Sequence, residues 1–450
     1  MLARKYKLPN LSWRGTWPWA QLALLIFPVF PALGAVSLSL LALVTCWRAY
    51  RQIVRSPVNW ALGVLSLWLI VTSSFAFKPS DAFLGLANLL PFFIIFAAFS
   101  VLIQTPAQLR RLAWILVIPS LPVVILGFGQ VFLGWATPAF WQNVSGWVLE
   151  AYGNPPGRMA SVFMYTNILA AYLQIVLILG LGLWIETFQA WQQGGHRLQD
   201  KQLLFLSVMV LGNAIALFLT SSRNAWGIAG LACLAFALYL GWRWIVLAVT
   251  AAASTILWAS FGPEFGRPWV RRLVPAFFWA RLSDQMYPNR PVATLRTTLW
   301  QFAWNMTLER PWIGWGLRNF TPLYEAKMHL WRGHPHSLLL MLLAETGIPA
   351  TLLFCGVIGW ILAQGILLLR DWQDITSLKD GTQWHPDQLI FFTYLIAFGG
   401  CVLFNLADVT LFDLRVNTLG WLLLSAICGV VYRYQDTLRL NRLEKSTNCD

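Results

Sequence analysis

Long apolar stretches, separated by short polar segments, run through most of the chain. A stretch of about 20 apolar residues is the length that an α-helix needs to cross a bilayer. The first stretch, 17–47, is long enough for two short spans, with a bend predicted near Pro28, Pro31 and Gly34. Further spans are predicted at roughly 58–77, 82–103, 112–134, 161–185, 203–220, 222–241, 243–261, 348–369, 388–407 and 415–432. We therefore expect an all-α polytopic membrane protein with about 12 transmembrane helices.

A long loop at 262–335 interrupts this series of spans. It is rich in aromatic residues, and between Leu295 and Leu308 its apolar residues recur at helical spacing, which predicts an amphipathic helix. The pattern divides the chain into an N-terminal bundle of about nine spans (1–261), a loop with amphipathic helices and a re-entry helix (262–347), and C-terminal spans with a tail (348–450).

Composition supports a membrane protein and argues against a soluble one. Hydrophobic residues make up 58% of the chain and charged residues 11%, whereas a soluble domain carries about 25% charged residues. A net charge of +14 would suggest nucleic acid in a soluble protein. Here the basic residues lie mostly between spans, so we expect contacts with membrane lipids or an anionic ligand and no nucleic-acid partner.

The basic residues also predict the orientation of the chain. If both termini are cytoplasmic, the inside segments hold 18 of the 32 basic residues. The short outside loops then hold four, Lys78, Arg158, Arg223 and Arg415, and the long loop holds the remaining ten. Loops longer than about 60 residues are exempt from the positive-inside rule, so the comparison is 18 against 4. We therefore expect the long loop on the outside.

Several familiar features are missing from the sequence. The first apolar run has no small-residue cleavage site after it, so we expect no cleavable leader. The six cysteines show no paired spacing, which indicates neither disulfides nor a zinc site. There is no carboxylate cluster with metal spacing, no P-loop and no Rossmann fingerprint. We expect neither a metal nor a cofactor.

Two arginines are candidates for binding an anion. Arg223 lies between two apolar runs with almost no loop, either as a cation facing a cavity or as a side chain that reaches the headgroups. Arg296 begins the amphipathic stretch of the long loop, where an arginine is more often part of a solvated face.

A histidine-containing segment marks the point where the long loop returns to the membrane. Ser337 can cap a short helix and Gly347 can end it, so His336 would lie at the helix N-terminus. The helix dipole keeps an imidazole neutral there, as a general base requires, although a histidine that only caps the helix is an equal alternative. His334 precedes it, and the carboxylate of Glu345, further along, needs an arginine or helix N–H groups as partners if it is buried.

Three polar residues at other outside span ends complete the candidates. Asp408 follows the penultimate span and could orient a histidine, pair with an arginine or be an ordinary loop aspartate. Arg158 and Asn167 flank another entry into the membrane, where a headgroup contact and a helix cap are the alternatives.

All these groups fall on the outside face, although they come from distant parts of the chain. Arginines bind phosphate oxygens bidentately. A histidine beside them suggests a base that acts on a hydroxyl near a phosphorylated leaving group.

Five segments resemble motifs of the O-antigen ligase and polymerase superfamily, which includes cyanobacterial proteins once called bicarbonate transporters. The stretch His336–Gly347 is similar to the pattern His-Asn-x-x-Leu-x-x-Leu-x-Glu-x-Gly, with Ser337 in place of Asn. The stretch Arg158–Tyr172 is similar to Arg-x-x-Gly-x-Phe-x-x-x-Asn-x-x-Ala-x-Tyr, with Ser161 in place of Gly. The other resemblances are Glu309–Phe320 with its Gly-x-Gly, the turn Thr220–Arg223, and Asp408.

The resemblance implies a GT-C-like glycosyltransferase in the bacterial inner membrane with its active site on the periplasmic face. Its donor would be a glycan on undecaprenyl diphosphate, and its acceptor a hydroxyl of lipid A–core or of a glycan. Arg223 and Arg296 would hold the diphosphate, and His336 would deprotonate, or hydrogen-bond, the acceptor hydroxyl for an inverting, metal-independent attack. Arg158, Asn167, His334, Glu345 and Asp408 would contribute to substrate binding.

Three alternatives remain open at this stage. A polymerase that extends the lipid-linked glycan would carry the same motifs. A transporter, for example of bicarbonate, should show polar or broken helices near the bilayer midplane, where the predicted spans hold only Asn88, Gln174 and Asn213. A non-catalytic scaffold would leave the convergence of arginines and histidine without a reason.

Overall fold

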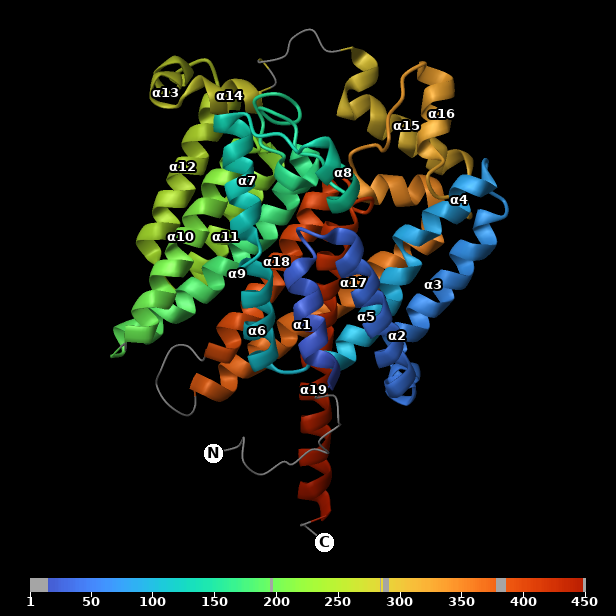
Figure 1. The fold of residues 1–450 in the computed structure, drawn as a ribbon, viewed down its shortest axis with the longest axis vertical. Helices are drawn as coiled ribbons and strands as arrows, with labels where there is room; N and C mark the ends of the chain where they lie inside the picture. The colour runs from blue at the N-terminus through green and yellow to red at the C-terminus, as the bar shows by residue number, and fades with distance from the viewer. Residues whose placement is uncertain (1–14, 195–196, 284, 286–290, 378–385, 448–450) are drawn as a thin grey trace.

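The computed structural model describes residues 15–194, 197–283, 285, 291–377 and 386–447. Helices dominate these ranges, and no strand occurs within them (Figure 1). The first half contains α1 (Thr16–Ile26), α2 (Pro31–Arg55), α3 (Pro57–Ser73), α4 (Pro79–Gly85), η3 (Leu86–Asn88), α5 (Leu90–Leu102), α6 (Pro106–Val117), α7 (Ser120–Leu133), α8 (Ala139–Ser145), η4 (Ser161–Phe163), α9 (Thr166–Gln192) and α10 (Arg197–Leu219). The second half contains α11 (Arg223–Tyr239), α12 (Arg243–Phe261), α13 (Arg267–Leu273), α14 (Ala276–Leu282), η5 (Val292–Thr294), α15 (Arg296–Glu309), α16 (Phe320–Met328), α17 (Leu338–Ser377), α18 (Pro386–Leu406) and α19 (Leu414–Thr447).

The polytopic membrane architecture expected from the sequence is confirmed. Among the described residues, nine helices are long and apolar enough to cross a membrane, counting α4–α5 and α6–α7 as one span each. The other three predicted spans are present as the shorter helices α1, α3 and α11, with 11, 17 and 17 residues. Every predicted span is therefore helical, and nine of them meet the criteria of length and composition.

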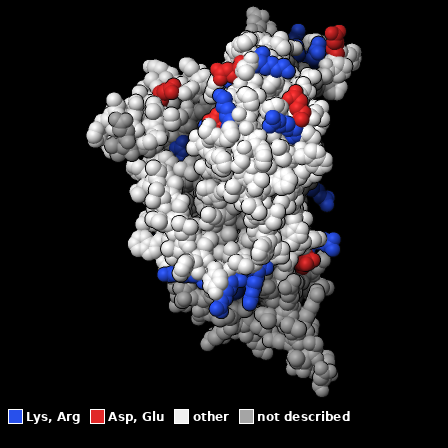
Figure 2. All heavy atoms as spheres, turned by 90° about the vertical axis from the view of Figure 1, so that its right-hand side faces the viewer, with Lys and Arg blue, Asp and Glu red and all other residues white. Residues whose placement is uncertain are grey.

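A wide uncharged belt surrounds the helical bundle. Figure 2 shows a broad band of side chains without charge between two ends that carry Lys, Arg, Asp and Glu. At the lower end of that view the charged residues are mostly Lys and Arg. An apolar belt bounded by charged ends is the surface that a bilayer requires.

The centre of the bundle is formed by α9, α18 and α19. In α9 and α19, 78% and 89% of the most apolar window is buried, against 11% in α12. The α12 helix therefore presents most of its surface to the surrounding lipid. The central helices meet in one large apolar core that includes Tyr172, Phe391 and Leu422.

Two spans are interrupted, contrary to the expectation of few broken helices. The span Pro79–Leu102 changes to 3-10 geometry at η3 and restarts at Leu90, and the span Pro106–Leu133 breaks before Ser120. Pro91 follows the first break and Pro119 lies in the second, and proline cannot continue the helical hydrogen-bond ladder. No ionisable residue occurs in 86–91 or 116–121.

The α17 helix combines the predicted re-entry helix and the following span. Oγ of Ser337 accepts the backbone N–H of Leu340 at 3.4 Å, as expected for a cap. At Gly347 the backbone turns to φ 82° and ψ 168°, a conformation that favours glycine, and Pro349 follows. The two parts of α17 consequently run in different directions (Figure 1).

The helices α13 to α16, called the loop layer here, cover one end of the bundle (Figure 1). The predicted amphipathic helix is α15, and its buried face packs against α16 and the first part of α17. These elements share a small apolar core of their own, formed by Leu299, Phe302, Ala303, Met306, Phe320, Tyr324 and Ala344. The α15 and α16 part of the loop layer is thus packed against the re-entry helix, whereas α13 and α14 contact α12.

The Gly-x-Gly segment fastens the loop layer to the kink in α17. N–H of Trp315 donates to O of Ala344, and N–H of Gly316 donates to O of Glu345. Gly314 has φ +67°, and a Cβ there would lie 2.5 Å from the carbonyl of Glu345. Only glycine allows the two backbones to approach this closely.

Candidate active site

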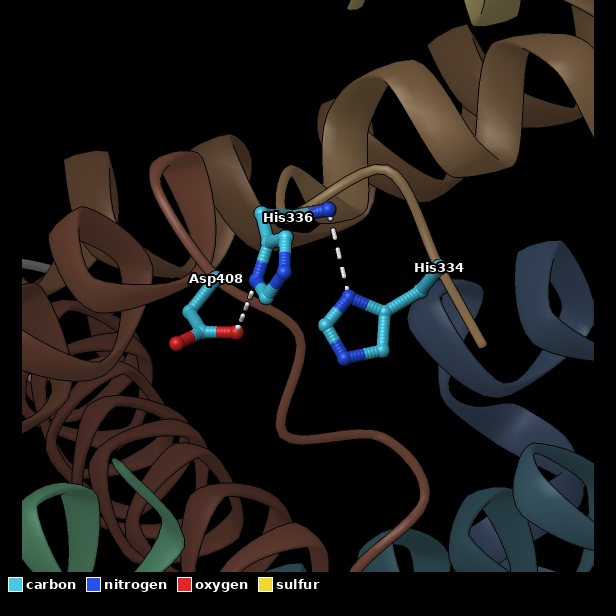
Figure 3. A group of neighbouring side chains, drawn as sticks. All are labelled: His334, His336 and Asp408. Carbon is cyan, nitrogen blue, oxygen red and sulfur yellow. Dashed lines mark hydrogen bonds and ion pairs between the residues drawn. The ribbon is translucent and has the colours of Figure 1, made fainter. Parts of the chain in front are cut away.

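His336 and Asp408 form a hydrogen-bonded pair at the end of the bundle that carries the loop layer (Figure 3). Nδ1 of His336 lies 3.1 Å from Oδ1 of Asp408, and the side chains are 24% and 7% exposed. A carboxylate at Nδ1 favours the tautomer that carries its proton there, which leaves the lone pair on Nε2. The pair is therefore arranged to present an unprotonated Nε2 to a reactant.

Burial and hydrogen bonding shift the pKa of the Asp408 carboxyl group in opposite directions. Burial alone would raise the pKa of its carboxyl group. The hydrogen bond and charge of His336, the charge of His334 and the N–H of Val409 outweigh it, so that the pKa lies below its usual value. Asp408 is therefore a carboxylate at neutral pH.

The pair continues into a chain of hydrogen bonds that reaches three other elements. Nδ2 of Asn167, at the start of α9, donates to Oδ2 of Asp408 at 2.7 Å. Arg158 donates through its Nη2 to Oδ1 of Asn167 at 3.2 Å and through its Nε to the carbonyl of Thr220 at 2.9 Å. Arg158 and Asn167 thus hold Asp408 in place from the far side of His336.

The backbone is unusual at three positions around this network. Ser161, Ser221 and His336 have φ values of +49°, +54° and +54°, in the left-handed region that non-glycine residues rarely adopt. The family pattern has glycine at the position of Ser161. Glycine adopts a positive φ readily, so the pattern agrees with the left-handed backbone found here. Strain of this kind persists where the surroundings hold it, and it clusters at functional sites.

His334 packs against His336 in the same corner (Figure 3). Nδ1 of His334 accepts the backbone N–H of His336 at 3.1 Å, and the ring centroids are 4.5 Å apart. Burial, reinforced by the charges of His336 and Arg296 and opposed by that of Asp408, lowers the pKa of His334 to about 4. The ring is therefore neutral at physiological pH and acts as an acceptor.

The two candidate arginines differ in their surroundings. Arg296 is exposed at the first position of α15, close enough to lower the pKa of His334. Arg223 begins α11, and its Nη1 donates to the carbonyl of Arg281 in α14. Its neighbour Asn224 donates to the carbonyl of Phe404 at the end of α18, close in sequence to Asp408. The structure thus brings the Arg223 turn beside the network, with its guanidinium directed towards α14.

Glu345 has a different environment from the one expected of a substrate-binding residue. It is 2% exposed, and its two oxygens accept the backbone N–H groups of Arg318 at 2.9 Å and Phe320 at 3.0 Å. These donors lie at the start of α16, so the requirement for helix N–H partners is met. This geometry makes Glu345 an anchor between α16 and α17, and we do not retain it for substrate contact.

One group of side chains has the composition of a metal site. His334, His336 and Asp408 each offer a ligand atom within 4.8 Å of the others, and no other such group occurs in the part of the chain that the structure describes. Oδ1 of Asp408 already accepts from His336 and from the N–H of Val409. Oδ1 of Asp408 and Nδ1 of both histidines therefore already take part in hydrogen bonds.

The sequence predicted the side chains of this site better than the backbone groups that support them. Arg158 donates to the backbone carbonyls of Thr220 and Ser221. Every residue has a backbone carbonyl, so the sequence does not indicate which carbonyls accept these hydrogen bonds. Gln130 was also missed: its Oε1 accepts the N–H groups of Ala160 and Ser161 and supports the strained turn before α9. The signal available in the sequence was a glutamine inside an apolar span, since such a side chain needs hydrogen-bond partners within the protein.

Fold and site together define a multi-span helical membrane protein with a histidine–aspartate pair at one membrane face. The family model described as O-Antigen ligase matches residues 205–355, about a third of the chain. That range runs from α10 into α17 and includes Arg223, Arg296 and His336. The match supports the resemblance to the O-antigen ligase superfamily that the motifs indicated. No curated protein matches it.

Proposed function

We propose that this membrane enzyme of the ligase and polymerase type transfers a glycan from undecaprenyl diphosphate to a hydroxyl acceptor on the periplasmic face. The observation that carries the proposal is the His336–Asp408 hydrogen bond, which directs a basic Nε2 outward from a fixed carboxylate. The match to the family model supports the reaction class. The orientation, with both termini cytoplasmic, rests on the distribution of basic residues.

In the proposed reaction, Nε2 of His336 accepts the proton of the acceptor hydroxyl. The hydroxyl oxygen attacks the anomeric carbon from the side opposite the diphosphate, so the configuration inverts. The bond between that carbon and the diphosphate oxygen breaks, and its electron pair leaves with the diphosphate. Arg296 and Arg223 stabilise the negative charge that grows on the leaving group. The protonated His336 is stabilised by Asp408 until it releases its proton.

This mechanism needs no metal, because the arginines supply the charge and the histidine supplies the base. It also fits the location of the candidate groups, which lie at one membrane surface where a lipid-linked diphosphate would be found. A transporter would require ionisable or coordinating groups along a path across the bilayer. The two interrupted spans have no ionisable residue at their breaks, so we favour transfer.

The direct test uses purified protein, a glycan on undecaprenyl diphosphate and a candidate acceptor. His336→Ala, Arg223→Ala and Arg296→Ala should each lower the rate of transfer by at least about 100-fold while the protein still folds. If all three variants remain active, the proposal is wrong. Glycan profiles of a deletion strain separate the two acceptor classes: unligated long chains indicate a ligase that uses lipid A–core or a similar acceptor, and single repeat units indicate a polymerase.

A further inference from the structure

Three side chains of the candidate active site have a second use as ligands for a metal ion. His334, His336 and Asp408 each offer one ligand atom, and these atoms lie within 4.8 Å of one another (Figure 3). Two imidazoles and one carboxylate, with a fourth position left open, are a ligand set that binds Zn²⁺. The cluster therefore has the number and the kind of ligands that a transition-metal ion requires.

The spacing of the first two ligands suits such an ion. Nδ1 of His336 lies 3.1 Å from Oδ1 of Asp408. Two ligands bound to Zn²⁺ at about 2.0–2.1 Å in tetrahedral geometry are roughly 3.3 Å apart. The ion can therefore take the place of the proton that these two atoms share, with little movement of either side chain.

His334 supplies the third ligand from a fixed position. Its Nδ1 presents a lone pair, which accepts the backbone N–H of His336, and its ring stacks on Phe412 at 6.2 Å. Only Pro335 separates the two histidines, and the φ of +54° at His336 directs both rings into the same corner (Figure 3). The ion competes with one hydrogen bond of His334, but little conformational freedom is lost when it binds.

Access and charge decide which ion the cluster takes. The His336 side chain is 24% exposed, so an ion reaches it from the end of the bundle that carries the loop layer, and Asp408 adds a buried carboxylate. The charge of Arg296 acts on His334 and opposes a cation, but Arg296 is exposed and solvent screens it. Mg²⁺ and Ca²⁺ prefer oxygen ligands, so two nitrogen ligands favour a transition metal.

We propose that His334, His336 and Asp408 form a reversible binding site for Zn²⁺ or a similar transition-metal ion, and that the bound ion inhibits glycan transfer. If the ion binds Nδ1 of His336, the ring proton moves from Nδ1 to Nε2, and a protonated Nε2 cannot act as a base. If it binds Nε2, it occupies the lone pair of the base directly. The inhibition rests on the proposed function, whereas the metal site rests only on the geometry of the three residues.

The binding test uses untagged full-length protein in detergent, with a chromogenic zinc chelator as the competitor. His334→Asn and Asp408→Asn should each weaken the tightest binding of Zn²⁺ by at least about tenfold. Excess Mg²⁺ should not displace Zn²⁺ from the wild type. His329→Asn is the matched control and should bind as the wild type, because His329 is exposed at the end of α16 with a left-handed backbone that asparagine also adopts.

The activity test adds Zn²⁺ to the transfer assay. The rate of the wild type should fall and should return when EDTA removes the ion. His334→Asn, compared with its own metal-free rate, should need at least about tenfold more Zn²⁺ for the same fractional inhibition. A melting curve without metal shows whether each variant is folded, and Zn²⁺ should raise the melting temperature of the wild type more than that of His334→Asn. A rate that rises with Zn²⁺, or that EDTA abolishes, overturns the inhibition.

The two proposals fail differently in this design. If Zn²⁺ binding depends on His334 and Asp408 but no glycan is transferred from undecaprenyl diphosphate, the proposed function fails together with the inhibition, and the metal site stands. If transfer occurs and depends on His336 while folded His334→Asn and Asp408→Asn bind Zn²⁺ as tightly as the wild type, only the metal site fails.

Discussion

Nδ1 of His336 lies 3.1 Å from Oδ1 of Asp408, although 72 residues separate them in the chain. His336 comes from the segment that precedes α17, and Asp408 from the loop between α18 and α19. The pairing gives the imidazole one defined tautomer, and every proposal about the reaction depends on that.

Asp408→Asn should lower the rate of transfer by about 10²- to 10⁴-fold with little change in fold. Oδ1 of Asp408 accepts from His336 and Val409, and its Oδ2 accepts from Asn167. An amide at this position must direct its NH₂ group at one of these donors. The measurement is kcat for transfer, together with a melting curve.

Glu264→Gln is the matched control for this substitution, because Glu264 is an acidic residue of the same end of the molecule with a 95% exposed side chain. It should transfer at the wild-type rate. A value of kcat within a few-fold of the wild type for Asp408→Asn would show that the carboxylate does not orient the base.

Asn167→Asp should impair the enzyme more than Asn167→Leu at pH 7. Asn167 donates to Asp408 at 2.7 Å, so an aspartate there brings two carboxylates together, and like charges at this distance oppose ionisation. We expect a loss of at least tenfold in kcat for Asn167→Asp. Measured rates in the reverse order would contradict the hydrogen-bond chain.

Arg296→Ala and Arg223→Ala should differ in stability although both lose activity. Each should lower kcat/KM by about 10²- to 10³-fold if it stabilises the leaving diphosphate. Arg296 is exposed, so its removal should leave the melting temperature unchanged. Arg223 also donates to the carbonyl of Arg281, so its removal should lower the melting temperature. A kcat/KM for Arg296→Ala equal to that of the wild type would remove Arg296 from the site.

Stability should fall as the pH decreases from 6.5 towards 4, in part because of His334. Its pKa is about 4 in the folded protein and 6.5 in the unfolded chain, so within this window the unfolded chain binds the proton first. Above pH 6.5 both states are neutral and His334 contributes no pH dependence. Melting temperatures in detergent at several pH values test this, and His334→Asn should show a smaller decrease. An identical pH profile for that variant would exclude the effect.

Glu345→Gln should destabilise the fold by about 1–3 kcal/mol, because one of two buried N–H donors loses its acceptor. The donors are the backbone groups of Arg318 and Phe320, so the loop layer should loosen first. Limited proteolysis and thermal melting measure the effect. Glu309→Gln, on the exposed side of α15, is the control and should behave as the wild type.

The sequence predicted the helices well, because apolar length and turn residues are local signals. The re-entry helix illustrates this: Ser337 and Gly347 define its start and end, and both act within a few residues. The interruption of the early spans was underestimated, since a proline in an apolar run also occurs in continuous helices.

The site was predicted as a set of residues and not as an arrangement. Charge placed Arg158, Asn167, His336 and Asp408 on one face, but their order in the hydrogen-bond chain depends on how α9, α17 and α18 pack, which is not a local property. The role of Glu345 could not be predicted from the sequence for the same reason. Its two oxygens accept backbone N–H groups at the start of α16, and this contact depends on how α16 packs against α17.

The separation of His336 from Asp408 has a consequence for biogenesis. While a ribosome is still making the chain, the histidine reaches the membrane long before the aspartate exists, and α18 must be inserted before the two can meet. A nascent or truncated chain therefore has an unoriented imidazole. Under the proposed function, the protein therefore cannot transfer a lipid-linked glycan efficiently until α18 and Asp408 have been inserted.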